Sequence, residues 1–566
     1  MINVLSTNIT SPLGLTTEQN YRAVLSGASA LRRYGPKAGE DRGPWGTTEP
    51  FAASLFCEEQ RAELAIDGHT FFEALAIRSV REALSHTKLD ISSPRVVLIL
   101  STTKGNIGQP VRYYPSEAAT KIAKTIGVTT TPIVVCNACV SGLSAQLLAD
   151  RLLSQGIYDY AIVVGAEVQG LFIVSGFQAL KAVSEAPCRP FDMERNGLNP
   201  GEAAATIVFA KTADGQGWCL ADGAARNDAY HIASPSPGAE GLTAAIETVM
   251  KGRDKRQLGA VCVHGTATLY NDQMEAKAIQ KAGLTDVPLS ALKGNYGHTM
   301  GAAGVLETIL SMRATDDGIV LSTKNFTELG VSGKVSISGG APRSTDKTAF
   351  LKIMSGFGGC NVAALYRKQA GPPAPFKGNT RTWTKVHTVK LSPKDGQTLT
   401  DIYRQEIGNY PKFHKMDILS RLAFVMAERL LKASPQEAEA GEGQGSEVDV
   451  ILFNHSSSVV ADRHYLATIC ADAESFVPLS RERFFPSPSV FVYTLPNIAA
   501  GEVAIRHHLH GETSFYILPE RDEALMRQIL EATLAKTNTR TAISGWVDAE
   551  SETNYECELS IYKTTS

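Results

Sequence analysis

The stretch 131–150 joins a short apolar run to a helical pattern, which constrains the kind of sheet this chain can build. Residues 133–135 (Ile-Val-Val) predict a buried strand, and leucines then recur at helical spacing at positions 143, 147, 148 and 152. Cys139 lies between the two, at a strand-to-helix turn with small neighbours. The free N–H groups and the positive dipole at a helix start favour a thiolate there. A single cysteine is more often a small buried hydrophobe, so this stretch alone leaves both roles open.

The rest of the first 370 residues repeats this alternation of short apolar strands and amphipathic helices. We expect helices at residues 17–25, 71–84, 118–126 and 275–282, and strands at residues 96–100, 159–165, 204–209, 259–264 and 349–354. The alternation predicts an α/β fold with a buried sheet.

Length and composition exclude several classes of protein. The length of 566 residues predicts more than one domain. With 55 Lys and Arg against 58 Asp and Glu, nothing global points to nucleic acid or to an anionic membrane. No apolar run reaches the ~20 residues of a membrane span, and the first residues lack the features of a signal peptide. Cys136 and Cys139 form a C-x-x-C pair, but no second pair of ligands accompanies it, so we expect no metal site. These features predict a cytoplasmic protein with free thiols.

Four motifs fall where predicted strands end. They centre on Cys139, on His264, on His298 and on the loop 356–359, which is Gly-Phe-Gly-Gly. Reacting groups in α/β sheets collect at strand ends because the loops converge there. Two imidazoles can donate hydrogen bonds to one thioester or carboxylate oxygen, and a thiolate can hold an acyl group. A single histidine is usually structural, but this set suits acyl transfer followed by carbanion attack.

The first ~370 residues resemble a β-ketoacyl-acyl carrier protein synthase of the condensing-enzyme, or thiolase-like, superfamily. The resemblance rests on motifs in the family's order, which are Ser11-Pro-Leu-Gly14, Asn137-Ala-Cys-Val-Ser-Gly142, Arg189-Pro-Phe-Asp192, His264-Gly-Thr-Ala-Thr268, Lys293-Gly-Asn-Tyr-Gly-His298 and Gly356-Phe-Gly-Gly-Cys-Asn361. It implies a layered αβαβα fold made of two βα halves, at about 1–210 and 211–370.

The resemblance also implies roles for the reacting groups. Cys139 would take the acyl group from the phosphopantetheine thiol of an acyl carrier protein. The backbone N–H groups of Cys139 and Phe357 would form the oxyanion hole. His264 and His298 would stabilise the enolate formed when the malonyl carrier loses carbon dioxide. The enzyme would need no cofactor of its own, because the carrier brings the phosphopantetheine.

Further residues would support the site. Lys293 and Glu307 resemble the family's charged pair, although an ordinary ion pair would look the same in sequence. Thr266, Thr268 and Gly358 match positions that bind substrate, and Phe357 matches the ring that gates the acyl pocket.

The chain departs from the family's pattern at three positions. Gly294 stands where the family usually has Ser, Ala267 where it often has Gly, and Cys360 where it usually has Thr. Cys360 raises the alternative of a thiolase, which uses a second cysteine near its C-terminus. The paired histidines with Lys293 favour the synthase.

About 195 residues follow the Pro-rich segment 371–375, where a synthase of this family would end. Apart from an acidic Gly-rich insert at 433–446, their predicted elements repeat the order of the N-terminal half. Without gaps from Pro115 and Pro496, Glu520 stands where Cys139 does. We therefore interpret residues 371–566 as a degenerate half-domain without a nucleophile, which could replace part of a partner subunit in a pseudo-dimer or add a layer to a homodimer. Its His507-His508-x-His510 cluster favours a solvated basic patch over a metal site.

One alternative function is a non-catalytic partner resembling a chain-length factor, which would bind an active synthase and shape its tunnel. Such partners lack the nucleophilic cysteine, whereas Cys139 and both histidines are present here. The sequence therefore predicts a catalytic β-ketoacyl synthase in fatty-acid-like or polyketide-like synthesis.

Overall fold

The computed structural model describes residues 2–36, 42–107, 114–211, 216–370, 382–393, 398–434, 447–472, 476–537 and 539–565. The segment 371–375 and nearly all of the acidic insert lie outside these ranges. None of the described helices is long and apolar enough to cross a membrane.

The first 210 residues supply five strands and the helices that cover them. These elements are β1 (Ile2–Thr10), α1 (Thr17–Leu25), β2 (Arg32–Tyr34), β3 (Phe51–Ala53), α2 (Glu58–Leu64), α3 (Phe71–Ser85), β4 (Val96–Ser101), α4 (Pro115–Ile126), β5 (Ile133–Val135), α5 (Ser141–Ser154), β6 (Tyr160–Glu167), α6 (Leu171–Ala179) and β7 (Ala203–Ala210). The main strands lie in the order β1-β7-β6-β4-β5.

The next segment, to residue 370, builds the second half of the fold. It contains β8 (Gln216–Asn227), α7 (Glu240–Met250), β9 (Leu258–Cys262), α8 (Leu269–Lys281), β10 (Pro288–Ser290), α9 (Lys293–Tyr296), α10 (Ala303–Asp316), β11 (Ile319–Val320), β12 (Ser336–Ile337), β13 (Arg343–Ser344), β14 (Ala349–Gly356) and β15 (Cys360–Ala370). Helix α8 begins earlier than the expected residue 275, because its first turn is polar and half-exposed and so gives no apolar period.

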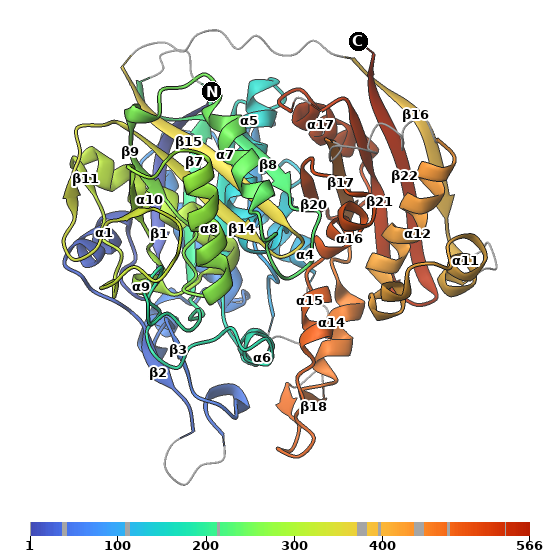
Figure 1. Cartoon of the computed structure of the whole chain (residues 1–566), viewed down its shortest axis with the longest axis horizontal. Coiled ribbons are helices and arrows are strands. Elements are labelled where there is room, and N and C mark those ends of the chain that lie inside the picture. The colour runs from blue at the N-terminus through green and yellow to red at the C-terminus, as the bar shows by residue number, and fades with distance from the viewer. Residues whose placement is uncertain are drawn as a thin grey trace.

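Helices α5 and α10 form the central layer of this part of the chain. Both contact strands of the first half and strands of the second half. Helix α3 covers the first set of strands from outside and packs on α4, while α7 covers the second set and packs on α8. The layers therefore alternate αβαβα, and the predicted fold class is confirmed (Figure 1).

Residues after 381 add a third block on the other side of β5. It contains β16 (Thr382–Leu391), α11 (Leu399–Glu406), α12 (Ile418–Lys432), β17 (Val448–Asn454), α14 (Val459–Leu466), β18 (Cys470–Asp472), β19 (Val477–Pro478), α15 (Pro488–Tyr493), α16 (Ile498–His507), β20 (Thr513–Ile517), α17 (Glu523–Leu534), β21 (Thr541–Ser551) and β22 (Asn554–Thr565). In Figure 1 this block forms the right-hand side of the molecule.

The strand order of the third block mirrors that of the first half. The continuous sheet runs β1-β7-β6-β4-β5 and then β20-β17-β21-β22-β16. The two sets meet where β5 and β20 pair antiparallel, with Val135 opposite Tyr516. Pairing also matches within each set, since β4 meets β6 at Val96↔Tyr160 and β17 meets β21 at Val448↔Thr541.

A buried ion pair and shared apolar cores join the third block to the rest of the chain. Arg151 on α5 makes a bidentate contact with Glu512, with its Nη1 2.6 Å and its Nη2 2.5 Å from the two carboxylate oxygens. Two large apolar clusters, one on each face of the sheet, contain residues from both sides of the β5–β20 junction. The described parts of the chain thus share one packed interior.

One face of the third block has become polar where it lacks a covering helix. In the first half, Val163 of β6 pairs with Ile207 of β7, and both belong to the apolar cluster that includes α10. The matching pair on β21 and β22 is Ser544 and Ser560. These serines line a hollow of about 230 Å³ in the described structure. Polar side chains suit a face that no counterpart of α10 covers.

Candidate active site

Cys139 lies in a 3₁₀ turn, residues Ala138–Val140, between β5 and α5. The Ser141 hydroxyl holds this turn, because it accepts from the Asn137 N–H at 2.8 Å and donates to the Ala138 carbonyl at 2.6 Å. Ala138 has a positive φ of 49°, which is strained for a residue with a Cβ. Cys139 itself is half-buried. The turn therefore presents the thiol at the start of α5, where the sequence predicts it.

The two histidines come from loops that buried hydrogen bonds fix. His264 follows β9, and the N–H groups of His264 and Gly265 donate to the two carboxylate oxygens of Glu275 on α8. His298 follows α9, and its Nδ1 accepts from the Met300 N–H at 3.2 Å. Because Nδ1 accepts a hydrogen bond, the neutral His298 ring carries its proton on Nε2.

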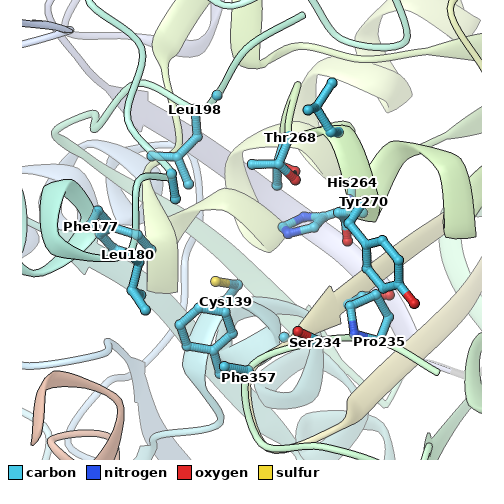
Figure 2. Close-up of a pocket in the computed structure, with 18 of the residues that line it drawn as sticks. Cys139, Phe177, Leu180, Leu198, Ser234, Pro235, His264, Thr268, Tyr270 and Phe357 are labelled. Carbon is cyan, nitrogen blue, oxygen red and sulfur yellow. Dashed lines mark hydrogen bonds between the residues drawn. The ribbon is translucent and has the colours of Figure 1, made fainter. Parts of the chain in front are cut away.

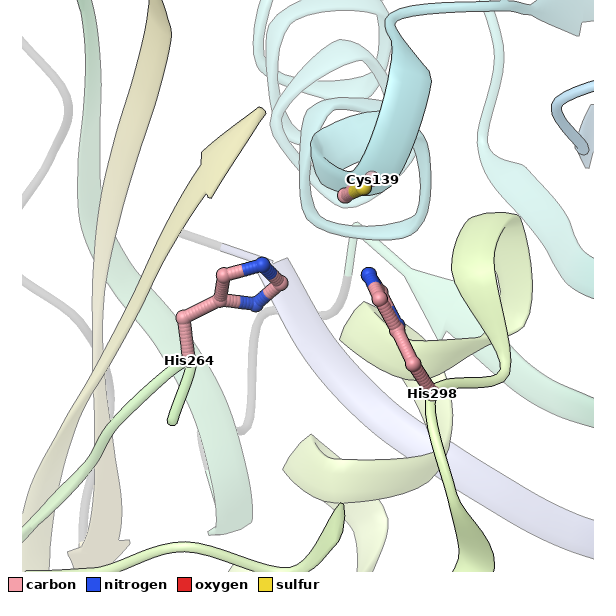
Figure 3. A group of neighbouring side chains, drawn as sticks. All are labelled: Cys139, His264 and His298. Atoms are coloured by element: carbon pink, nitrogen blue, oxygen red, sulfur yellow. The ribbon is translucent and has the colours of Figure 1, made fainter. Parts of the chain in front are cut away.

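The thiol and the imidazoles converge on one point. Cys139 Sγ and a ring nitrogen from each of His264 and His298 all lie within 4.8 Å of one another (Figure 3). The ring centroids are 5.0 Å apart and the rings are nearly perpendicular, at 80°. Nδ1 of His264 and Nε2 of His298 are buried without a hydrogen-bond partner. These unpartnered groups can bind substrate atoms.

Burial sets the protonation state of these groups. It lowers the pKa of both imidazoles well below the usual value, and the positive charges of Lys293 and Lys352 lower it further. Burial also raises the pKa of Cys139 to about 12, although Lys293 opposes the shift. The expectation of a thiolate at the helix start is therefore wrong for the empty site, because desolvation outweighs the favourable helix terminus. The resting site holds a neutral thiol between neutral imidazoles.

The predicted pair of Lys293 and Glu307 lies behind His264. Lys293 Nζ is 2.7 Å from Glu307 Oε1 and donates to the His264 carbonyl at 2.6 Å. The sequence analysis missed a third member, Lys352 on β14, whose Nζ is 2.6 Å from Glu307 Oε2. The only signal for it was a lysine inside the apolar run 350–354.

A cavity of about 520 Å³ opens onto Cys139, His264 and His298 (Figure 2). Thr266 and Thr268 line it, and their hydroxyl oxygens are 2.9 Å apart. Apolar side chains form much of the remaining wall, including Phe177, Leu180, Leu198 and Phe357. The cavity thus offers hydroxyl groups on one side of the thiol and apolar surface on the other.

The glycine loop after β14 packs on the Cys139 turn. A Cβ on Gly356 would lie only 3.4 Å from the backbone nitrogens of Cys139 and Val140. Phe357 lines the cavity, and its carbonyl accepts from the Asn497 side chain of the third block at 2.8 Å. Gly358 does not line the cavity. Its N–H donates to the Ile232 carbonyl at 2.7 Å, so the structure gives no support to its predicted contact with substrate.

The other candidate groups lie elsewhere. Cys360 is buried against the third block, with Sγ 3.1 Å from Thr513 Oγ1, so it supplies no second thiol to the cavity. His507 approaches Glu428, whereas His510 contacts the Asn227 carbonyl. In the described part of the chain, the one group of three or more potential metal ligands that lie together is Cys139 with the two histidines.

Family models match most of the catalytic region. The model of the β-ketoacyl synthase N-terminal domain matches residues 1–215, and that of the C-terminal domain matches residues 219–327. This chain belongs to the β-ketoacyl synthase family. The 3-oxoacyl-[acyl-carrier-protein] synthase 2 of Mycobacterium leprae is 30% identical over 273 residues, which are 45% of this synthase and 65% of that relative. The protein of the same name from Vibrio cholerae is 26% identical over 405 residues, 63% of this chain and 96% of the relative.

Solved structures share the fold of this synthase. A β-ketoacyl synthase from Burkholderia phymatum STM815 covers 65% of this chain and 99% of its own, with a TM-score of 0.57 and 21% identity. The structure described as PfaC Keto synthase-Chain length factor covers 100% of this chain and 78% of its own, with a TM-score of 0.73 and 13% identity. The second likeness extends over the third block as well.

Proposed function

We propose that this chain condenses an acyl group, held as a thioester on Cys139, with malonyl-acyl carrier protein in fatty-acid-like or polyketide-like synthesis. The convergence of Cys139 Sγ with the two imidazoles, all within 4.8 Å inside a cavity, carries the proposal. The names of the 3-oxoacyl-[acyl-carrier-protein] synthase relatives support this class of substrate. We assign the catalytic unit to residues 1–370.

In the first step, Cys139 exchanges thioesters with the acyl carrier. Its sulfur attacks the acyl carbonyl, the bond to the carrier's sulfur breaks, and the thiol proton of Cys139 passes to the leaving thiol. Because the resting thiol is protonated, this proton must leave as the C–S bond forms. Backbone N–H groups of Cys139 and Phe357 would stabilise the oxyanion, each typically by ~3 kcal/mol.

In the second step, the malonyl carrier loses carbon dioxide and becomes an enolate. The bond to the carboxylate carbon breaks, and its electron pair moves into the thioester. The Nε2–H of His298 and an N–H of His264 would donate to the thioester oxygen as negative charge develops there. The enolate carbon then attacks the acyl group, and Cys139 leaves with the bonding pair and takes up a proton.

We propose that residues 371–566 act as a built-in partner of the catalytic unit. The mirrored strand order supports a pseudo-dimer. The position equivalent to Cys139 is Glu520, which is exposed three residues after the end of β20. The likeness to a structure described as a keto synthase–chain length factor extends over the whole of this chain.

This partner would close the acyl pocket. Cys139 and Phe177 border an apolar cluster that contains Phe491 and Tyr465 of the third block. Phe491 meets Phe177 edge to face, with the ring centroids 5.3 Å apart. An acyl chain that extends from Cys139 past Phe177 would meet these rings, so we propose that the catalytic unit accepts short chains.

Intact-mass spectrometry tests the catalytic assignment. Wild type and Cys139→Ala are incubated with an acyl carrier protein that bears a short acyl chain. We expect wild type to gain the mass of one acyl group and the variant to gain none. Failure of wild type to acylate, with Cys139 still open to alkylation, would instead favour a non-catalytic partner of another synthase.

A further inference from the structure

Lys352 is a fully buried lysine in the middle of strand β14. Its relative exposure is 0%, and its neighbours Phe350, Leu351, Ile353 and Met354 are equally buried. Taking an ammonium group out of water costs several kcal/mol unless it is paired and hydrogen-bonded. A residue that costs this much at this position calls for a specific role.

The contacts of Lys352 connect it to the loop that carries His264. Its Nζ lies 2.6 Å from Glu307 Oε2 and donates to the Val263 carbonyl at 3.1 Å. The other oxygen of Glu307 lies 2.7 Å from Lys293 Nζ, which itself donates to the His264 carbonyl. The two lysines therefore share one carboxylate and reach two consecutive carbonyl groups beside the imidazole.

This arrangement leaves a surplus positive charge behind the active site. Burial by itself would raise the pKa of Glu307, but the two ammonium groups hold it below its usual value, so the carboxylate is ionised. Two positive charges therefore face one negative charge in a site closed to water. Glu275 lies next to the same loop, where burial raises the pKa of its carboxyl group to about 7.

A buried positive charge affects the decarboxylation step more than acyl exchange. The enolate places negative charge on the thioester oxygen near His264 and His298, and fixed charges in a dry site stabilise such states strongly. Acyl exchange ends with the same charges with which it began. The second lysine thus distinguishes between the two steps.

We propose that Lys352 is a positioning residue for decarboxylation, which acts on His264 and His298 through the surplus positive charge of the Lys293–Glu307–Lys352 cluster. This proposal rests on the proposed condensation, in which the imidazoles face the developing enolate. It makes the charge of the cluster, rather than the packing of the Lys352 stem, the quantity that matters.

Three variants separate charge from packing. Lys352→Met keeps the stem and makes the cluster neutral. The double variant Lys352→Met/Glu307→Gln removes one charge of each sign, so it restores the single surplus charge while the amide oxygen introduced at position 307 can still accept from Lys293. Lys368→Met is the matched control, because Lys368 on β15 also pairs with a carboxylate at 2.7 Å but is half-exposed.

Two measurements follow each variant. Release of carbon dioxide from malonyl pantetheine reports decarboxylation, and the mass gain from hexanoyl pantetheine reports acylation of Cys139. We expect Lys352→Met to lower kcat for decarboxylation about tenfold or more, the scale of one lost electrostatic contribution, and to change acylation less than about twofold. The double variant should recover to within about threefold of wild type, and Lys368→Met should match wild type.

The outcomes are decisive in each case. Decarboxylation by Lys352→Met within twofold of wild type, or a double variant no faster than the single one, overturns the proposal. If Lys352→Met does not fold, the double variant decides, since near-normal decarboxylation supports the surplus charge and a tenfold loss refutes it. Wild type that neither acylates nor releases carbon dioxide would overturn the condensing function itself, which is a different result.

Discussion

Replacing Phe491 with alanine should convert a short acyl pocket into a longer one. The side chain is 3% exposed and lies against three aromatic rings, at centroid distances of 5.3 Å from Phe177, 5.2 Å from Tyr465 and 6.2 Å from Phe172. A Cβ on Gly176 would overlap the Phe491 ring, so helix α6 accommodates this ring only because it has glycine there. Phe491 thus fills the space between α6 and the third block.

The magnitudes follow from this packing. Removal of a fully packed phenylalanine costs about 3–5 kcal/mol of the free energy of unfolding, because a cavity remains. A longer acyl chain that enters the cavity regains about 0.8 kcal/mol for each CH₂ group buried, which is about a fourfold gain in affinity for each carbon. Phe491→Ala should therefore shift the preference for chain length while it lowers the stability.

The assay is the rate of Cys139 acylation by a series of acyl carriers of increasing chain length, with denaturant unfolding measured alongside. Phe424→Ala is the matched control. Phe424 is fully buried in the third block and stacks on Tyr410, away from the active-site cavity. We expect both variants to lose similar stability and only Phe491→Ala to prefer longer chains. An unchanged chain-length profile in folded Phe491→Ala would refute the closed pocket.

Three further predictions concern the junction and the site. Arg151→Met should lower the free energy of unfolding by about 3–5 kcal/mol, since it leaves Glu512 buried without its partner, and unfolding should remain one cooperative transition in circular dichroism; two separate transitions would contradict a shared interior. Because burial and nearby lysines lower the pKa of both imidazoles, they take up protons only well below pH 6.5, so decarboxylation should stay constant as the pH falls through that value; a rate that halves at pH 6.5 would show the opposite. Gly358→Ala should reduce both thermal stability and turnover, because its φ is +87° and the new Cβ would lie 2.7 Å from the Asn497 side chain; unchanged melting temperature and kcat would disprove this.

The sequence was informative where function depends on local geometry. An apolar strand, a few small residues and a helical leucine pattern placed Cys139 at a helix start, and glycine-flanked histidines after predicted strands placed His264 and His298 in loops. These patterns are local because a strand end and the following turn are encoded within a short stretch of chain. The αβαβα fold and the lining threonines Thr266 and Thr268 followed from the same motifs.

The third block was only partly visible in the sequence. The order of its elements indicated a repeat, but the junction between β5 and β20 joins residues far apart in the chain, and no local pattern encodes such a pairing. The same limit explains the misplaced Gly358, which faces Asn497 of the third block rather than the cavity.

The sequence by itself determined which reactive groups the chain carries and at which strand ends they stand. Only the tertiary structure decided their electrical state, because a pKa depends on burial and on charges from distant segments. Cys139 looked like a thiolate from its place at a helix start, yet desolvation keeps it a thiol. Lys352 looked out of place in a strand, yet its charge meets Glu307 behind His264. Periodicity encodes faces and turns, whereas electrostatics depends on which faces meet.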